Sequence, residues 1–162
     1  LRPAFAENGT ITPANSSSIS DGASALLLAS EQAVETHGLT ARARIVAHSR
    51  NSLAPEAFTL APIGAAEDVL AKAGWSVADV DLWEINEAFA MVTMLTMDAL
   101  KLDPSCVNVH GGACAQGHPI GSTGSRIIVT LMHALEHYGK KRGVAALCIG
   151  GGEATAVAIE LV

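Results

Sequence analysis

Blocks of apolar and polar positions alternate along the chain, and they predict a succession of strands and helices. A polar opening over residues 1–22 precedes a continuous apolar run at Ala23–Ala29, which is typical of a strand buried on both faces. Ser30 resembles a helix cap and Gly38 a helix stop, so a short helix is expected between them. Residues Ala43–His48 predict a second strand.

The middle of the chain continues this alternation. Pro62 is expected to open a helix that runs through Ala73 and ends at Gly74. Val80–Ile85 predicts a third strand. The helix expected at Glu87–Leu100 is apolar on nearly every face, which predicts that it is buried inside a layered protein.

The last third of the chain begins with a glycine-rich segment at Gly111–Arg126 and continues into a helix expected at Ser125–Tyr138, which Gly139 ends. Two apolar runs, Val144–Cys148 and Ala154–Leu161, flank a glycine turn and predict an antiparallel hairpin. The whole pattern therefore predicts one α/β domain with a mixed five-stranded sheet and helices on both faces.

The composition excludes several classes of protein. With 162 residues, 49% hydrophobic and 16% charged, the chain can bury a full core, which excludes disorder. Its apolar runs are far shorter than the roughly 20 residues of a membrane span, and no signal pattern opens the chain, so we expect a cytoplasmic protein. The net charge is −6 and the one basic cluster is Lys140–Arg142, which makes nucleic acid an improbable partner. Three cysteines at irregular spacing predict reduced thiols.

Several short patterns suggest chemistry that their context does not support. His133–His137 spells the H-x-x-E-H zinc pattern but lacks a third ligand. His110, Cys114 and His118 are spaced as ligands on one helix, yet the glycines between them make that helix implausible. No lysine follows the glycines as in a P-loop, and their spacing differs from the dinucleotide fingerprint. We therefore expect no metal and no nucleotide cofactor.

Three polar side chains remain at the ends of expected strands or in glycine loops. Asn86 follows a strand, His118 lies between a glycine and a proline, and Cys148 precedes Gly150–Gly152. Each has a structural explanation, as a helix cap, a loop histidine and an inert buried thiol. Together an imidazole, a thiol, an amide and glycine N–H donors are what acyl chemistry through an oxyanion requires.

These residues lie in segments that resemble a known family. Asn86–Ala90, Gly111–Gly121 and Cys148–Gly152 resemble, in the same order, three C-terminal signature blocks of the thiolases, which include acetyl-CoA acetyltransferases and 3-ketoacyl-CoA thiolases. Asn15–Ala23 resembles the segment that opens the family's C-terminal domain, so the resemblance covers essentially all 162 residues. It implies that residues 1–162 form the C-terminal half of a layered αβαβα fold, with the helix at 87–100 between two similar sheets.

The resemblance implies a role for each candidate. His118 corresponds to the histidine that activates a nucleophilic cysteine and helps to bind the thioester oxygen, and Asn86 to the asparagine that holds a water in the same oxyanion hole. Cys148 corresponds to the acid/base cysteine and Gly150 to the backbone donor of a second oxyanion hole. The implied reaction is acyl transfer between coenzyme A thioesters, by Claisen condensation or by thiolytic cleavage of 3-ketoacyl-CoA, through an acylated cysteine.

The same resemblance places the substrate. Ser17 matches a serine near the pantetheine arm of coenzyme A, and Gly117 lies in the histidine loop. Phe58–Pro62 stands where many relatives carry Met-Gly-x-Gly-Pro beside the acyl pocket, so Phe58 is expected to contact substrate and to alter its selectivity. Gln116 replaces a usually apolar residue beside His118. Coenzyme A thioesters are the implied substrates, and no further cofactor is implied.

The family's nucleophile belongs to an N-terminal domain that this sequence lacks, and Cys106 and Cys114 match no nucleophile motif. The chain begins without a methionine, and we expect it to be part of a larger protein that is inactive as this fragment. The expected partners are acyl-CoA substrates, the thiolase N-terminal domain and further copies in a dimer or tetramer; the fragment alone is expected to self-associate through its uncovered helix face. The alternatives are a catalytically silent thiolase-like domain and, disfavoured by Cys148–Gly152, another condensing-enzyme relative.

Overall fold

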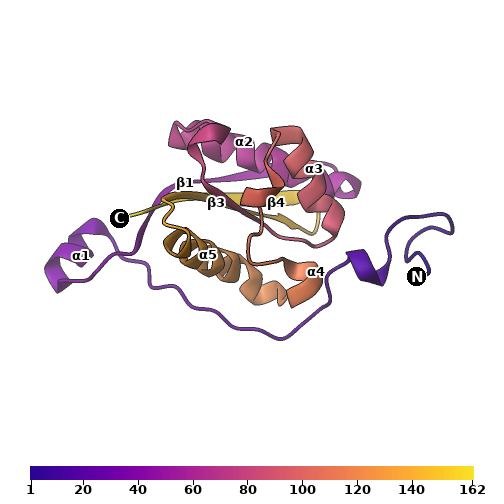
Figure 1. Ribbon diagram of the computed structural model, residues 1–162, viewed down its shortest axis with the longest axis horizontal. Helices are drawn as coiled ribbons and strands as arrows, with labels where there is room; N and C mark the ends of the chain where they lie inside the picture. Colours follow the sequence, from indigo (N-terminus) through magenta and orange to yellow (C-terminus); the bar gives the residue numbers. More distant parts are fainter.

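A four-stranded mixed sheet forms the centre of the computed structural model, which describes residues 1–162 (Figure 1). The strands are β1 (Ala43–Ser52), β2 (Leu82–Ile85), β3 (Arg142–Ile149) and β4 (Glu153–Leu161). Their order is β1-β4-β3-β2. β4 pairs antiparallel with β1 and β3, whereas β2 pairs parallel with β3. The mixed sheet and the β3–β4 hairpin are confirmed, but the sheet has four strands where the sequence pattern predicts five.

The missing strand is the apolar run Ala23–Ala29, which is extended but pairs with no strand. It passes along the α5 side of the molecule (Figure 1), where Leu27 is 86% exposed. Ser24 Oγ fastens this segment to α5, since it lies 2.8 Å from Ser122 Oγ and 2.6 Å from Ser125 Oγ. The strand prediction is wrong because a continuous apolar run suits an extended segment laid over a helix as well as a buried strand.

Helices cover both faces of the sheet (Figure 1). The α-helices are α1 (Glu31–His37), α2 (Ala61–Ala73), α3 (Ala90–Leu100), α4 (Ala113–Gln116) and α5 (Ile120–His137). Short 3-10 turns are η1 (Pro13–Asn15), η2 (Pro55–Leu60), η3 (Val77–Asp79) and η4 (Pro104–Cys106). α2 and α3 lie on one face, and α4 and α5 lie on the other.

The predicted caps of the first two helices are confirmed. Ser30 Oγ accepts a hydrogen bond from the backbone N–H of Ala33 at 3.2 Å, and Gly38 ends α1 with a φ of 59°. Gly74 ends α2 in the same left-handed conformation. Where a helix boundary depends on a local cap, the sequence therefore locates it to within a residue.

Two helix boundaries differ from the prediction. α5 begins at Ile120, five residues before the expected Ser125, because the carbonyl of Pro119 accepts from the N–H groups of Ser122 and Thr123 and starts the helix there. α3 begins at Ala90, and only Val92, Thr93 and Thr96 on it are buried. In this chain the helix packs on one side against α2 and η2, and its remaining faces are partly or fully exposed, as expected where the partner domain is not present.

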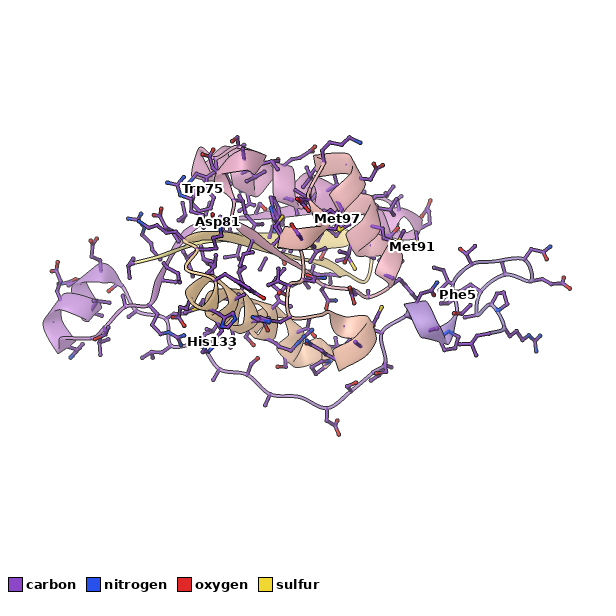
Figure 2. All side chains as sticks on the ribbon, viewed as in Figure 1. Phe5, Trp75, Asp81, Met91, Met97 and His133 are labelled. Atoms are coloured by element: carbon purple, nitrogen blue, oxygen red, sulfur yellow. The ribbon has the colours of Figure 1, made fainter.

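Two hydrophobic cores fill the spaces on either side of the sheet. The larger, on the α2 side, contains the aromatic Trp83 and a row of small residues from β4: Ala154, Ala156 and Ala158. The smaller, on the α5 side, groups Leu82, Ile127, Leu131, Ala134, Leu135, Ala145 and Ile159. Side chains occupy both layers, whereas the N-terminal segment that carries Phe5 projects beyond the body of the sheet (Figure 2).

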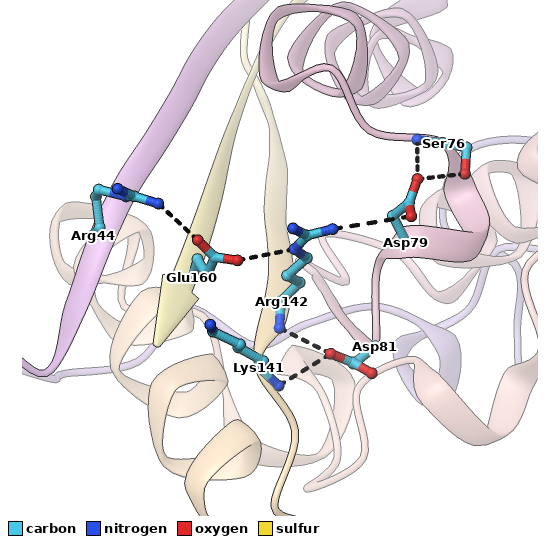
Figure 3. Close-up of polar contacts among 7 residues, drawn as sticks. All are labelled: Arg44, Ser76, Asp79, Asp81, Lys141, Arg142 and Glu160. Carbon is cyan, nitrogen blue, oxygen red and sulfur yellow. Dashed lines mark hydrogen bonds and ion pairs between the residues drawn. The ribbon is translucent and has the colours of Figure 1, made fainter. Parts of the chain in front are cut away.

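A polar chain closes the end of the sheet where β3 begins (Figure 3). Glu160 Oε1 accepts from Arg142 Nε at 3.0 Å, and Glu160 Oε2 accepts from Arg44 at 2.8 Å. Asp81 Oδ2 accepts from the backbone N–H groups of Lys141 and Arg142 at 3.0 and 2.9 Å. The basic cluster Lys140–Arg142 therefore leads into β3, and its side-chain and backbone bonds connect β3 to β4 and to the residue before β2. No helix of the chain combines the length and the apolarity needed to cross a bilayer.

We expect Gly143→Ala in β3 to lower the free energy of unfolding by about 1–3 kcal/mol, because a Cβ there would come within 2.7 Å of the buried Leu131 side chain on α5. Gly124→Ala is the matched control, since its Cβ would lie 3.9 Å from Leu147. Within α5 it is expected to leave stability unchanged or to raise it by up to about 1 kcal/mol. Urea unfolding of both variants measures the difference, and equal losses would contradict the close packing of α5 on β3.

Candidate active site

The topology brings the three candidate side chains to one edge of the sheet. β2 and β3 are parallel, so their carboxyl ends meet, and the backbone N–H of Asn86 after β2 donates to the carbonyl of Ala146 at 2.9 Å. α5 returns antiparallel beneath β3, because Leu131 near its end meets Gly143 and Gly124 near its start faces Leu147. The residues just before α5 therefore lie at the same edge as the end of β3.

Asn86 is the most buried of the three candidates. Its residue is 2% exposed, and neither Oδ1 nor Nδ2 has a hydrogen-bond partner within the chain. Leaving a buried amide unpaired costs roughly 1–3 kcal/mol, so a group that bonds to it there gains that much. The helix-cap explanation of Asn86 is wrong, since Phe89 is the residue before α3 and no side chain caps that helix.

His118 is held by its backbone and by one ring nitrogen. Its N–H donates to the carbonyl of Ser18 at 2.8 Å, and Nδ1 lies 2.7 Å from Thr123 Oγ1. Because the Thr123 hydroxyl donates to the carbonyl of Pro119 at 3.0 Å, it accepts from Nδ1–H, and Nε2 is left with a free lone pair. Burial, with a smaller effect from the Arg126 guanidinium, lowers the pKa of His118, which favours the neutral imidazole.

Cys148 lies near the end of β3 opposite Ala154 of β4 and is buried. Burial raises the pKa of its thiol, which keeps the thiol protonated. Val144 and Ala146 pack on the α2 side, so the alternation of the strand directs Cys148 to that side as well. The structure thus brings Cys148, His118 and Asn86 to one edge, but no hydrogen bond joins their side chains.

The glycine turn after Cys148 leaves donors at the same edge. Gly151 and Gly152 have φ values of 91° and 93°, a conformation that other residues rarely adopt. Gly150 is exposed with open space where a Cβ would stand, and its N–H donates no hydrogen bond within the chain. Such an amide is available to a carbonyl oxygen or an anion.

Residues 16–24, here called the serine segment, connect the asparagine loop after β2 with the histidine loop before α5. Ser17 donates to the carbonyl of Ala88 from both its N–H, at 3.1 Å, and its hydroxyl, at 3.0 Å. Its neighbours form isolated bridges to Phe89 and His118. Ser17 is thus brought beside the segments that carry Asn86 and His118, although its hydroxyl is engaged by the backbone.

The two other expected substrate residues occupy different places. Gly117 directly precedes His118 with a φ of 91°, and a Cβ there would overlap the side chain of Ser20. Phe58 lies in η2, and its ring packs edge-on against Phe89 with centroids 6.3 Å apart. Gly117 therefore provides the backbone conformation that the histidine loop requires. Phe58 contacts Phe89, which lies three residues after Asn86, and its ring forms no aromatic pair with His118.

Sequence reasoning missed two carboxylates. Glu87 Oε2 accepts from the N–H of Cys114 at 3.0 Å and so anchors the glycine-rich loop, while its neighbour Gly112 has no room for a Cβ beside that carboxylate. Glu84 is 4% exposed on the α5 side of β2, and burial raises its pKa to about 8 although Arg126 acts in the opposite direction. A glutamate between the apolar residues Leu82, Trp83 and Ile85 of an expected strand was the available signal.

The H-x-x-E-H pattern stays on the solvent side of α5. His133 Nδ1 lies 3.7 Å from Glu136, and the Glu136 carboxylate is already bound by Arg42 at 2.7 Å. The carboxyl ends of β2 and β3 are therefore a better candidate for the active site than the H-x-x-E-H pattern, because they offer a neutral imidazole, a protonated thiol, an unpaired amide and glycine N–H donors. This set of groups can bind a carbonyl oxygen and move a proton beside it.

Comparison with protein families agrees with this fold. The thiolase C-terminal domain model matches residues 39–161, and the thiolase N-terminal domain model matches residues 1–32. The chain belongs to the thiolase family.

Named relatives and solved structures give the same result. Cytosolic acetyl-CoA acetyltransferase of Mus musculus is 49% identical over 162 residues, and the match covers 99% of this chain and 41% of the mouse protein. The crystal structure of Bacillus anthracis acetyl-CoA acetyltransferase matches with a TM-score of 0.97 at 42% identity, over 100% of this chain and 41% of that one. Human mitochondrial 3-ketoacyl-CoA thiolase in complex with CoA matches with a TM-score of 0.93 at 41% identity, with the same coverage. The chain thus spans about two fifths of the length of these relatives.

The buried carboxyl of Glu84 makes stability depend on pH. Its raised pKa means that the folded state holds a proton that the unfolded state releases above about 4.5, so stability is full below that pH and falls as pH rises toward about 8. We expect urea unfolding to show a loss of roughly 2–4 kcal/mol from this group between pH 5 and 8.

The Glu84→Gln variant is expected to remove that part of the slope, because an amide cannot ionise. Glu35→Gln on the exposed helix α1 is the control and should retain the slope of the unmodified chain. Parallel stability curves for Glu84→Gln and the unmodified chain would show that the carboxyl is not held protonated.

Proposed function

We propose that this chain supplies the histidine, the asparagine and the acid/base cysteine of a thiolase. The reaction is acyl transfer between coenzyme A thioesters, as Claisen condensation or thiolytic cleavage of 3-ketoacyl-CoA. The observation that carries the proposal is the convergence of Asn86, His118 and Cys148 at one sheet edge, in a chain 49% identical to an acetyl-CoA acetyltransferase.

In this proposal His118 and Asn86 serve the first half-reaction. The free Nε2 of a neutral His118 accepts the proton of the nucleophilic thiol, which the resemblance assigns to an N-terminal domain. The thiolate attacks the thioester carbonyl, the acyl group moves to the cysteine and coenzyme A leaves as a thiol. The buried amide of Asn86, unpaired within the chain, supports the oxyanion of that step.

Cys148 and Gly150 serve the second half-reaction. In the condensing direction the Cys148 thiolate removes a proton from the α-carbon of a second thioester, and the resulting carbanion attacks the acyl-enzyme while the nucleophilic cysteine leaves. In the cleaving direction a protonated Cys148 returns the proton to the α-carbon, a role that suits its raised pKa. The N–H of Gly150 makes no hydrogen bond within the chain, which supports its proposed role as donor to the acyl oxygen.

Coenzyme A thioesters are the proposed substrates. Ser17 bonds to the asparagine loop at Ala88, Gly117 directly precedes His118, and the ring of Phe58 packs against Phe89 of the asparagine loop. One relative, human mitochondrial 3-ketoacyl-CoA thiolase, has a solved complex with CoA. We propose that the pantetheine arm passes Ser17 and that Phe58 influences the acyl group accepted. A cytosolic place of action is proposed from the name of the mouse relative.

Turnover by this proposal requires the N-terminal domain, so residues 1–162 alone are expected to be inactive. The α5 side exposes Leu27, Leu28, Ile45 and Ile120, an apolar surface that a partner domain would cover. Assembly of the complete protein into a dimer or tetramer is part of the same proposal.

A catalytically silent domain that binds coenzyme A esters is the second candidate. The observation that favours it is that Cys148 turns toward the α2 side and makes no hydrogen bond with His118. If Cys148 and His118 do not act together in catalysis, the glycine-rich loops would serve only to bind coenzyme A esters.

The test joins residues 1–162 to the N-terminal three fifths of the Bacillus anthracis acetyl-CoA acetyltransferase. Cys148→Ala is expected to slow exchange of the acetyl-CoA methyl protons with D2O by about 10²–10⁴-fold, because a positioned base contributes about that much. Acylation of the nucleophilic cysteine, followed by intact mass, should persist.

Cys106→Ala, away from the sheet edge, is the control and should retain both half-reactions. Equal loss of exchange and acylation in Cys148→Ala would contradict the acid/base role. A fused protein that binds acetyl-CoA without acylation or exchange would favour the silent domain.

A further inference from the structure

Gln116 makes two hydrogen bonds that fasten the glycine-rich loop just before His118. Its Nε2 donates to the carbonyl of His110 at 2.7 Å, and its Oε1 accepts from Arg126 NH1 at 2.9 Å. The side chain therefore bridges the start of the loop and helix α5. Gln116 itself is exposed, so the two bonds hold it in one conformation that an unpaired glutamine on a surface would not keep.

The backbone of this loop has few other attachments. α4 is a single turn, Gly111 and Gly117 have φ values of 86° and 91°, and the amide of Gly117 donates to Ala113 within the same turn. Glycines in this conformation raise the entropy that the loop loses on ordering. Beyond the loop itself, Glu87 anchors Cys114, and Gln116 is the side chain that closes the other end.

Arg126 gives this closure a charged partner. The bond to Gln116 is the one side-chain hydrogen bond of its guanidinium, and Nε is buried with no partner. The guanidinium acts to lower the pKa of Glu84, but the two groups form no ion pair. Without Gln116, no hydrogen bond from another side chain would fix the orientation of the Arg126 guanidinium. A hydrogen bond to a charged donor contributes more than a neutral one, which supports the Gln116 contact despite its exposure.

We propose that Gln116 is a positioning residue: by bridging the carbonyl of His110 and the guanidinium of Arg126, it fixes the loop that presents His118 and the direction of the Arg126 guanidinium. This inference rests on the proposed function for its catalytic meaning, but the loop closure stands on contacts within the chain. Gln116 touches neither substrate nor reacting atoms in this proposal and acts through His118.

Three variants separate the parts of the bridge. Gln116→Met keeps the length of the side chain and removes both bonds. Gln116→Glu keeps an acceptor for Arg126 and removes the donor to His110. Gln32→Met makes the same exchange on the exposed face of α1 and is the matched control.

The first measurement is amide hydrogen exchange in residues 1–162, which requires no activity. Gln116→Met is expected to speed exchange of the amides at 113–118 by about tenfold, which corresponds to about 1.4 kcal/mol for the loss of both exposed bonds together, and to leave β3 and β4 unchanged. Gln116→Glu should lie between, and Gln32→Met should match the unmodified chain. Exchange within twofold of the unmodified chain across 113–118 in Gln116→Met would overturn the proposal.

The second measurement is the NMR titration of the His118 ring. Since the Arg126 cation helps to lower the pKa of His118, its release in Gln116→Met should move the midpoint up toward the usual value, and Arg126→Met should do the same. A purely structural loss of stability would not move this midpoint. A midpoint that rises in Arg126→Met but stays fixed in Gln116→Met would show that Gln116 does not hold the cation, and would overturn that part.

The kinetic measurement uses the fused protein described above. Gln116→Met should lower kcat by about tenfold with a smaller change in KM, and Gln116→Glu should recover part of it. If the unmodified fused protein is inactive, the proposed function fails while exchange and titration still decide on the bridge. If kcat falls without a change in exchange or titration, Gln116 acts directly and the positioning role is wrong.

Discussion

The antiparallel packing of α5 against β3 is the constraint on which the rest of the molecule depends. A short turn after His137 reverses the chain, Gly143 lets the buried Leu131 lie close over the strand, and Gly124, nearer the start of the helix, faces Leu147 without such crowding. With both contacts fixed, the start of the helix must lie over the end of the strand. The imidazole loop and the thiol then share an edge although 30 residues separate them, and the parallel β2 adds the carboxamide beside them.

Local signals made most of the fold predictable. Ser30, Gly38 and Gly74 act within one turn of the helices they limit, so the sequence alone locates those ends. The hairpin of β3 and β4 follows from two apolar runs around glycines with positive φ. What could not be predicted depends on distant partners: the run Ala23–Ala29 has the composition of a strand, but its neighbours are α5 and a serine cluster instead of another strand.

The sequence predicted which residues belong to the candidate site, but it predicted less of the contacts that position their side chains. The resemblance named Asn86, His118 and Cys148, and strand topology brings all three to one edge. The sequence carried no sign that Thr123 would fix the ring of His118, because that contact depends on α5 beginning at Ile120. The glutamate in the strand was visible in the sequence, but the influence of Arg126 on it was not, since the two residues lie 42 positions apart and approach only when helix and strand pack.

The serine segment, residues 16–24, lies outside the sheet but contacts the loops that carry two of the candidate residues. Residues 16–24 make no strand of the sheet, yet they bond the carbonyl of Ala88, the amide of His118 and the hydroxyl of Ser122. They match the family's N-terminal domain model, whereas the sheet and its two cores belong to the span matched by the C-terminal one. A shortened polypeptide starting near position 39 would therefore keep all four strands and both hydrophobic cores but lack the hydrogen bonds that connect the asparagine loop, the histidine loop and the start of α5.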